Sequence, residues 1–153
     1  MKQKVFSVDT ERCIACRACE VACAREHGGN AHVFLTPADG GRLLPLCCMH
    51  CEKSPCVESC PTSALERVAQ GAVIVHQSRC IGCGMCIIAC PFGVISQDGE
   101  RGVQKCDRCI HRLNRGREPV CVLTCPTGAL IYDAPDTMTS RRRTTYALKA
   151  KKK

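Results

Sequence analysis

The cysteines of this chain fall into four groups of four with one left over, and this pattern constrains the fold more than any other feature. Seventeen of the 153 residues are Cys. The groups are Cys13, Cys16, Cys19 and Cys23; Cys48, Cys51, Cys56 and Cys60; Cys80, Cys83, Cys86 and Cys90; and Cys106, Cys109, Cys121 and Cys125. So many regularly spaced thiols indicate a cross-linked framework, which is built from disulfides, zinc or iron–sulfur clusters.

The rest of the composition offers little material for an apolar core. The chain has no Trp, two Tyr and three Phe. Disulfides need an oxidising compartment, and the first residues show neither an apolar signal segment nor twin arginines. No stretch approaches the length of a membrane span. We therefore expect a cytoplasmic protein without a membrane anchor of its own, unless a partner with an export signal carries it across a membrane.

The spacing within the groups favours iron–sulfur clusters over zinc. Groups one and three read C-x2-C-x2-C-x3-C, which is the spacing of bacterial ferredoxins. Three closely spaced sulfurs reach three irons of one cubane, and the fourth Cys, about one helical turn further, reaches the neighbouring cubane. Zinc uses two C-x2-C pairs, and group four alone would fit such a site, but groups one and three would not. The four cysteine groups thus predict four [4Fe–4S] clusters.

The charge of the chain has to be read together with its metal. The formal charge is +8, but each oxidised cluster with its four thiolates contributes about −2. Residues 134–153 hold seven basic residues and one acidic residue. We expect an acidic cluster-bearing body with a basic tail that is partly disordered when alone. The tail lacks interleaved aromatic residues, so nucleic-acid binding is not expected.

Short helices and strands are expected between the cysteine loops, which makes the fold class α+β. Strands are expected at residues 4–8, 71–76 and 129–132, and helices at 19–26 and 107–114. Segments 92–96 and 102–105 flank Asp98-Gly99 as a hairpin. The segment 28–46, with two Gly-Gly pairs and Pro37, is expected to be a loop over the surface or into a partner.

Three motifs carry a resemblance to a known family. They are the runs 48–56 (CMHCEKSPC), 105–109 (KCDRC), and 116–121 (GREPVC) followed by 125–130 (CPTGAL). With these, residues 5–133 resemble the four-cluster iron–sulfur subunits of dimethyl sulfoxide reductase, formate dehydrogenase, hydrogenase, carbon monoxide dehydrogenase and tungsten aldehyde oxidoreductase complexes. The resemblance implies two pseudo-symmetric ferredoxin-like modules within residues 1–133. The outer module is about 1–27 plus 100–133, the inner about 41–99, and 134–153 is the tail.

The resemblance also implies which groups share clusters. Cluster a would use Cys13, Cys16, Cys19 and Cys125; cluster b Cys23, Cys106, Cys109 and Cys121; cluster c Cys48, Cys51, Cys56 and Cys90; cluster d Cys60, Cys80, Cys83 and Cys86. The x2 spacing to Cys51 and the family pattern both favour Cys48 as ligand over Cys47. Cys47 is then either a small buried hydrophobe or a residue with a redox or rescue role.

The histidines are not needed as ligands. His50, inside the group-two loop, has an N–H that would reach a cluster sulfur. The other four, His27, His32, His76 and His111, show no metal-like spacing with one another and are expected to be surface or structural residues.

The expected function is electron transfer without catalysis by the chain alone. The sequence has no phosphate-binding glycine loop, no acid–base dyad and no nucleophile constellation. The resemblance implies a large catalytic subunit with tungsten or molybdenum pterin or nickel, with a lean toward tungsten aldehyde oxidoreductase. A further redox partner would be a flavin or NAD subunit, and copies of the chain would also be able to stack as a homo-oligomer. The alternative is a free-standing polyferredoxin that serves several enzymes.

Overall fold

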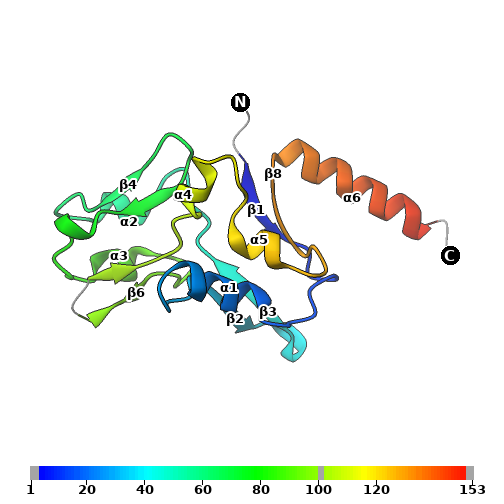
Figure 1. Ribbon diagram of the computed structural model, residues 1–153, viewed down its shortest axis with the longest axis horizontal. Helices are drawn as coiled ribbons and strands as arrows, with labels where there is room; N and C mark the ends of the chain where they lie inside the picture. Colours follow the sequence, from blue (N-terminus) through cyan, green and yellow to red (C-terminus); the bar gives the residue numbers. More distant parts are fainter. Residues whose placement is uncertain (1–3, 100–101, 151–153) are drawn as a thin grey trace.

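Small two-stranded antiparallel sheets and short helices surround the cysteine loops (Figure 1). The computed structural model describes residues 4–99 and 102–150. The strand pairs are β1 (Val5–Val8) with β8 (Leu130–Asp133), β2 (Val33–Pro37) with β3 (Leu43–Cys47), β4 (Leu65–Arg67) with β5 (Val73–Val75), and β6 (Ser96–Gln97) with β7 (Val103–Gln104). The helices are α1 (Ala18–Glu26), α2 (Pro55–Glu58), α3 (Met85–Ala89), α4 (Ile110–Leu113), α5 (Val120–Thr124) and α6 (Pro135–Ala150), with single 3₁₀ turns at Asp39–Gly41 and Gln77–Arg79. The expected mixture of helices and strands is confirmed.

The first and last strands of the cysteine-bearing region pair with each other. Val5 lies opposite Asp133 and Val8 opposite Leu130. The rings of Phe6 and Tyr132 pack 5.1 Å apart across this pair, and helix α1 packs against helix α5. These contacts bring group one, near the start of the chain, beside group four, near its end. The strands expected at 4–8 and 129–132 are confirmed.

The expectation that residues 28–46 form a loop is wrong for most of that segment. Strands β2 and β3 form a hairpin in which Val33 pairs with Cys47 and Pro37 with Leu43. Both strands are apolar runs, and Val33 is almost fully buried. The second Gly-Gly pair supplies the turn, because Gly40 and Gly41 both adopt φ of 75°. Gly-Gly therefore marks a hairpin turn here rather than a long loop.

Two further expectations hold in part. The strands at β6 and β7 pair as a hairpin around Asp98 and Gly99, although residues 100–101 of its turn lie outside the described residues. Helix α4 begins at Ile110, not at residue 107, because Arg108 and Cys109 have left-handed backbones and belong to the ligand loop.

The basic tail forms a helix rather than a partly disordered segment. Helix α6 extends from the body (Figure 1), and Met138 is its buried side chain. Pro135 suits the first turn of a helix, and Arg141 forms an ion pair of 3.3 Å with Asp133. The expectation rested on low apolar content and did not anticipate these contacts. Residues 151–153 of the tail lie outside the described residues.

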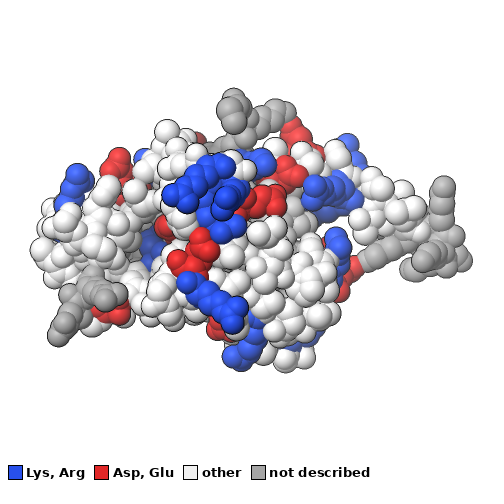
Figure 2. Space-filling view, in the orientation of Figure 1, with Lys and Arg blue, Asp and Glu red and all other residues white. Residues whose placement is uncertain are grey.

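Cysteines form much of the buried core. Three clusters of buried residues combine cysteines with aliphatic side chains such as Val73, Leu65 and Leu130. Charged side chains lie outside this core for the most part, and Figure 2 shows Lys and Arg interspersed with Asp and Glu over the middle of one face. In the described part of the chain, no helix has the length and apolarity that crossing a membrane requires.

Candidate metal centres

The four C-x2-C loops share one backbone turn. The second intervening residue of each loop is left-handed: Ala15 (φ 54°), His50 (φ 49°), Gly82 (φ 68°) and Arg108 (φ 62°). In two of the loops this turn directs a backbone N–H at the first cysteine, with 3.4 Å from His50 N to Cys48 Sγ and from Arg108 N to Cys106 Sγ. Hydrogen bonds to sulfur favour the thiolate, which is the form that ligates iron.

The last cysteines of groups two and four have matching surroundings. Ala64 N donates to Cys60 Sγ and Ala129 N to Cys125 Sγ, each at 3.2 Å. Burial acts to raise the pKa of both thiols. The hydrogen bonds from these N–H groups, and from Thr62 to Cys60 and Thr127 to Cys125, outweigh this effect of burial. The pKa of each thiol is lowered as a result, so both sulfurs are prepared to act as thiolate ligands.

The structure brings the four cysteines expected for cluster a to one place. Cys13, Cys16, Cys19 and Cys125 line a small pocket between the group-one loop and the start of β8. Burial raises the pKa of Cys19 to about 11, and the charges of Cys125 and Cys16 add to this rise. A thiolate at Cys19 is therefore unfavourable without a cation to bind.

The other sets also lie close enough for their charges to interact. Burial raises the pKa of Cys121, and Cys47, Cys109, Cys23 and Cys19 add to the rise. The pKa of Cys56 is raised first by burial and further by Cys48 and Cys90. The pKa of Cys86 is raised by burial and by Cys60 and Cys80. Each of these neighbourhoods includes cysteines that the family resemblance places in one cluster, and that of Cys121 also includes Cys47 and Cys19 of set a.

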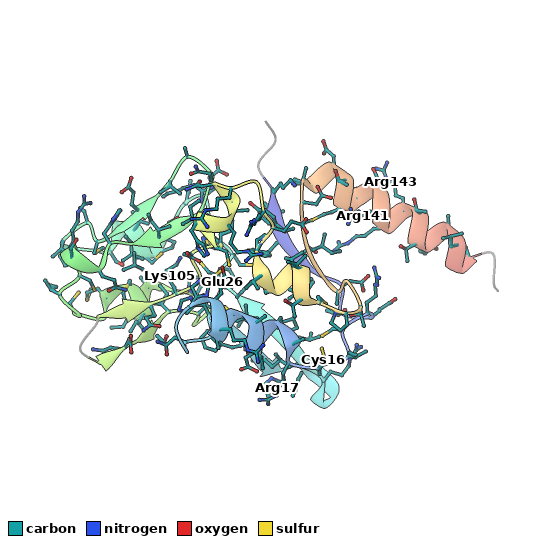
Figure 3. All side chains as sticks on the ribbon, viewed as in Figure 1. Cys16, Arg17, Glu26, Lys105, Arg141 and Arg143 are labelled. Carbon is teal, nitrogen blue, oxygen red and sulfur yellow. The ribbon has the colours of Figure 1, made fainter. Side chains whose placement is uncertain are left out.

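Exposure of the cysteines differs between the groups. Cys16 of group one and Cys83 of group three are exposed, whereas Cys106, Cys109 and Cys121 of group four are buried. Cys16 and Arg17 lie at the edge of the molecule, far from the interior position of Lys105 (Figure 3). Thus two of the candidate centres reach the surface and one is enclosed.

Two histidines contribute more than the sequence indicated. His27 Nδ1 lies 3.6 Å from Cys23 Sγ, and His27 Nε2 lies 3.1 Å from Asp107 Oδ1. These hydrogen bonds raise the pKa of His27 to about 11. The ligand atoms of Cys23, His27 and His32 lie within 4.8 Å of one another, as do those of His27, Asp107 and Cys109. Sequence spacing missed this arrangement because it joins helix α1 to the group-four loop.

The remaining histidines differ in their surroundings. His76 pairs with Glu66 and His111 with Glu26, each at 2.7 Å near the surface, as expected of surface or structural residues. His50 is buried, and its Nδ1 accepts the backbone N–H of Val73 at 2.9 Å. Burial, together with Lys105, lowers the pKa of His50 to about 2, so its ring is neutral.

Cys47 lies in the buried core on strand β3. It packs with Cys19, Cys23 and Cys121, and only 4% of its surface is exposed. Burial raises its pKa to about 12, with Cys48 adding to the rise. This environment suits the small-hydrophobe role better than a reactive one.

Left-handed ligand loops, N–H groups directed at sulfur and clustered buried thiols together define an iron–sulfur protein. The donor set fits [4Fe–4S] clusters, since cysteine thiolates are their usual ligands. A family of 4Fe–4S dicluster domains matches residues 41–134, and a 4Fe–4S binding domain matches residues 10–26. The chain belongs to this family of 4Fe–4S proteins, and its sixteen grouped cysteines fit four clusters.

Several curated proteins are similar to the chain. The iron–sulfur subunit of nitrate-inducible formate dehydrogenase from Escherichia coli is 37% identical, over 82% of this chain and 52% of the relative. A thiosulfate reductase electron transfer subunit from Salmonella typhi is 39% identical, over 88% and 77%. The B subunit of anaerobic dimethyl sulfoxide reductase from Haemophilus influenzae is 34% identical, over 98% and 81%.

The chain therefore spans about half the length of the formate dehydrogenase subunit and most of the length of the other two. The resemblance to iron–sulfur subunits of oxidoreductases is confirmed. These relatives lend no support to the lean toward tungsten aldehyde oxidoreductase, nor to the free-standing polyferredoxin.

Proposed function

We propose that the chain is an electron-transfer subunit that relays single electrons through four [4Fe–4S] clusters between a large catalytic oxidoreductase subunit and another redox partner. The clusters supply the one-electron chemistry, while the chain holds and spaces them and carries no catalytic site of its own. The observation that carries the proposal is the continuous series of cysteine-lined buried cores. The names of the relatives, which include an electron transfer subunit and the B subunit of a reductase, support it.

The ligand sets are proposed as the family resemblance implies them, and their contacts support the order a–b–c–d. One core places Cys19 of set a against Cys23 and Cys121 of set b. A second packs Cys106 of set b against Cys48 and Cys90 of set c. The third packs Cys90 and Cys56 of set c with Cys60, Cys80 and Cys86 of set d. Each core thus brings two neighbouring ligand sets together, as electron transfer along a series of clusters requires.

The fourth cysteine of each group is proposed to bind the cluster of a different group, and this gives a direct test of the ligand sets. Cys90 follows the group-three loop, but its charge acts on Cys56 of group two. Cys90→Ser is expected to damage cluster c and leave cluster d intact. Cluster-resolved EPR of the reduced protein measures this, with Cys47→Ser as the control that keeps all four signals. Loss of the cluster d signal alone would contradict the assignment.

We also propose the two-module division. The outer module would be residues 1–27 plus 100–133, the inner module 41–99, and residues 134–153 a separate basic tail. The matching turns in the four C-x2-C loops support pseudo-symmetry, as does the packing of α1 on α5 and of α2 on α3. Strand β3 of the inner module would then pair with β2, which lies between the two modules in sequence and packs against α1 of the outer module.

Both ends of the series carry apolar side chains suited to docking. Ile14, beside Cys13, is 64% exposed, and Ile81, at the equivalent position beside Cys80, is 67% exposed. Ile88 on α3 is 82% exposed. Exposed large aliphatic side chains around an exposed cluster ligand favour contact with a partner protein at each end. The partners would be the catalytic subunit at one end and a flavin or NAD subunit, or a second copy of this protein, at the other.

The compartment and the metal of the catalytic subunit stay predictions. A cytoplasmic location suits a chain with 17 cysteines, because reduced thiols are needed for cluster assembly. Fractionation of the native host tests it. Binding of nucleic acid is not proposed for the loaded protein.

The function is tested by anaerobic affinity purification of the tagged protein from its host, with iron, tungsten, molybdenum and nickel analysis. We expect a large subunit at a stoichiometric ratio, together with about sixteen Fe per molecule. Ile81→Lys and Ile14→Lys are each expected to release one partner and retain the iron. A fully loaded protein that comes down alone would instead support the free-standing polyferredoxin.

A further inference from the structure

Three cationic side chains converge in the interior between the group-two and group-four loops. Lys105 is 4% exposed and Arg108 is 1% exposed, while Arg67 on β4 is partly buried. Figure 3 shows Lys105 in the interior of the body, away from the surface position of Cys16 and Arg17. Buried charges of this kind are unfavourable unless something nearby compensates them.

The hydrogen-bond partners of Lys105 and Arg67 are neutral carbonyl groups. Lys105 Nζ donates to Val73 O and, at 2.7 Å, to Cys106 O. Arg67 Nη1 donates to His50 O at 2.7 Å and to Cys51 O at 2.6 Å. Within residues 4–99 and 102–150, no carboxylate forms an ion pair with these three cations, and the nearby Asp107 pairs with His27.

Burial lowers the pKa of Arg108, and its interactions with Tyr132 and Cys106 offset this only in part. Its Nη1 donates to Gln70 O at 3.3 Å, and its guanidinium carbon lies 5.8 Å from the centre of the Tyr132 ring. Its Nε is buried and has no hydrogen-bond partner among the described residues. A nearly fully buried guanidinium that forms no ion pair with a described carboxylate, and whose Nε–H has no partner among the described residues, is suited to stabilise a further negative charge nearby.

The imidazole of His50 has the same property. Its Nδ1 accepts the Val73 N–H, so the proton of the neutral ring is on Nε2, which is buried and without a partner among the described residues. His50 and Arg108 occupy equivalent positions in the group-two and group-four loops. Each of these buried donors lies between two proposed ligands of one cluster, Cys48 and Cys51 of cluster c for His50, and Cys106 and Cys109 of cluster b for Arg108.

The C-x2-C loops of groups one and three, at the two ends of the series, lack these side chains. The equivalent positions in groups one and three are Ala15 and Gly82, neither of which has a donor beyond its backbone. The exposed cysteines Cys16 and Cys83 show that those loops reach solvent. Side-chain donors at this loop position are therefore found beside clusters b and c, of which set b is enclosed and set c is partly buried.

On the basis of the proposed function, we propose that the three cations Lys105, Arg67 and Arg108, together with the N–H of neutral His50, raise the reduction potentials of clusters b and c. Each electron added to a cluster adds one negative charge, and burial opposes this addition. The nearby positive charges and N–H donors favour the reduced form and so offset the effect of burial. Electrons can then pass through the middle of the series without a large drop in reduction potential at clusters b and c.

The decisive variant is Lys105→Met, which removes the charge at nearly constant volume and lies outside the C-x2-C loops. In holo-protein with the full iron content, EPR-monitored potentiometric titration is expected to show lower midpoint potentials for clusters b and c alone. Lys105→Arg is expected to restore the wild-type values. The matched control is Lys53→Met, since Lys53 lies in the group-two ligand run but is exposed.

Four unchanged midpoint potentials in fully loaded Lys105→Met would overturn the inference while leaving the proposed function intact. If Lys105→Met does not load four clusters, Arg67→Met decides by the same criterion, because Arg67 lies on strand β4 outside all four ligand groups. A wild-type protein without reducible clusters would instead overturn the proposed function.

Discussion

Left-handed backbone conformations recur wherever the chain turns around a cysteine. After the last cysteine of groups two and four, the third residue is Ser63 (φ 51°) in one case and Gly128 (φ 59°) in the other. This conformation costs a residue with a Cβ about 1–2 kcal/mol. The same turn is thus built with strain at Ser63 and without it at Gly128.

A pair of exchanges tests this strain. Gly128→Ala is expected to destabilise the holo-protein by about 1 kcal/mol, and Ser63→Gly to stabilise it by a similar or smaller amount. Anaerobic thermal unfolding followed by the cluster absorbance measures both. A stabilising Gly128→Ala would show that the left-handed turn is not maintained in the loaded protein.

Gly102 is required for a different reason, namely space beside a proposed ligand. A Cβ added there would lie 2.7 Å from Cys80 Sγ. Gly102→Ala is therefore expected to displace Cys80 and reduce the occupancy of cluster d, with about one cluster's share of iron and EPR intensity lost. Gly99→Ala is the control, because nothing lies within 4 Å of its Cβ although its φ is also positive. Full loading of Gly102→Ala would contradict the placement of Cys80.

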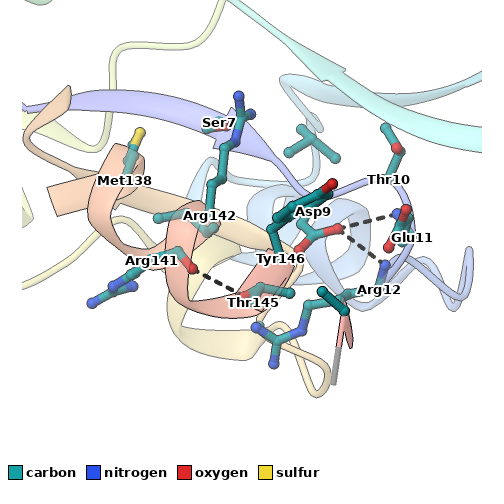
Figure 4. Close-up of a pocket in the computed structure, with 14 residues that line it drawn as sticks. Ser7, Asp9, Thr10, Glu11, Arg12, Met138, Arg141, Arg142, Thr145 and Tyr146 are labelled. Carbon is teal, nitrogen blue, oxygen red and sulfur yellow. Dashed lines mark hydrogen bonds between the residues drawn. The ribbon is translucent and has the colours of Figure 1, made fainter. Parts of the chain in front are cut away.

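At the level of whole elements, helix α6 depends on very few contacts. Met138 is 9% exposed and packs toward the body, and Arg142 Nη2 lies 3.4 Å from Ser7 Oγ. Between α6 and residues 7–12 lies an open groove of about 620 Å³. Figure 4 shows Tyr146 projecting from α6 toward Asp9 across this groove. The helix is therefore attached at its beginning and free along most of its length.

Met138→Ala is expected to loosen this attachment. Loss of a buried Met side chain costs about 2 kcal/mol or more, which corresponds to at least a tenfold faster hydrogen exchange in residues 135–150. Exchange measured by mass spectrometry reports on this segment, while the iron content is expected to stay constant. Tyr146→Ala, at a position 76% exposed, is the control. Equal exchange in both variants would mean that Met138 does not attach the helix.

The elements that could be predicted from sequence are those set by local pattern. The strands around Phe6 and Ile131 follow from short β-branched and aromatic runs, and helix α1 ends where His27-Gly28-Gly29 interrupts it. The proximity of thiols within each C-x2-C loop follows from spacing alone. Hairpin β2–β3 was missed because its Gly-Gly turn and its prolines resemble loop punctuation. Helix α6 was missed because, among its residues whose burial is described, Met138 alone is buried, and one apolar position is too weak a pattern to identify a helix.

Side chains that act across the fold were harder to predict than the ligands themselves. His27 reaches Asp107 and Arg67 reaches the His50 carbonyl over long sequence separations. No spacing rule connects such residues, since each contact depends on how a ligand loop packs against a residue outside it. Cysteine spacing therefore predicts where clusters bind, and tertiary structure determines what surrounds them.

For the molecule as a whole, the clusters replace much of a conventional core. Cysteines account for a large part of the buried residues, and burial raises the pKa of several of these thiols. Without iron, these cysteines stay protonated and lose their cross-links. Removal of iron by a chelator under anaerobic conditions is therefore expected to unfold most of the chain. Circular dichroism that keeps the holo spectrum after complete iron removal would contradict this expectation.

The pairing of β1 with β8 has a consequence for how the protein is made. In the proposed ligand sets, Cys13, Cys16 and Cys19 are synthesised before the other ligands, yet their fourth partner, Cys125, is the last of the seventeen cysteines to be synthesised. Residues 41–99 contain every ligand of clusters c and d and are complete much earlier. Cluster insertion would thus proceed from the middle of the chain outward. The earliest thiols to be synthesised would wait longest for iron, and during translation they would be the ones most in need of protection from oxidation and from the wrong metal.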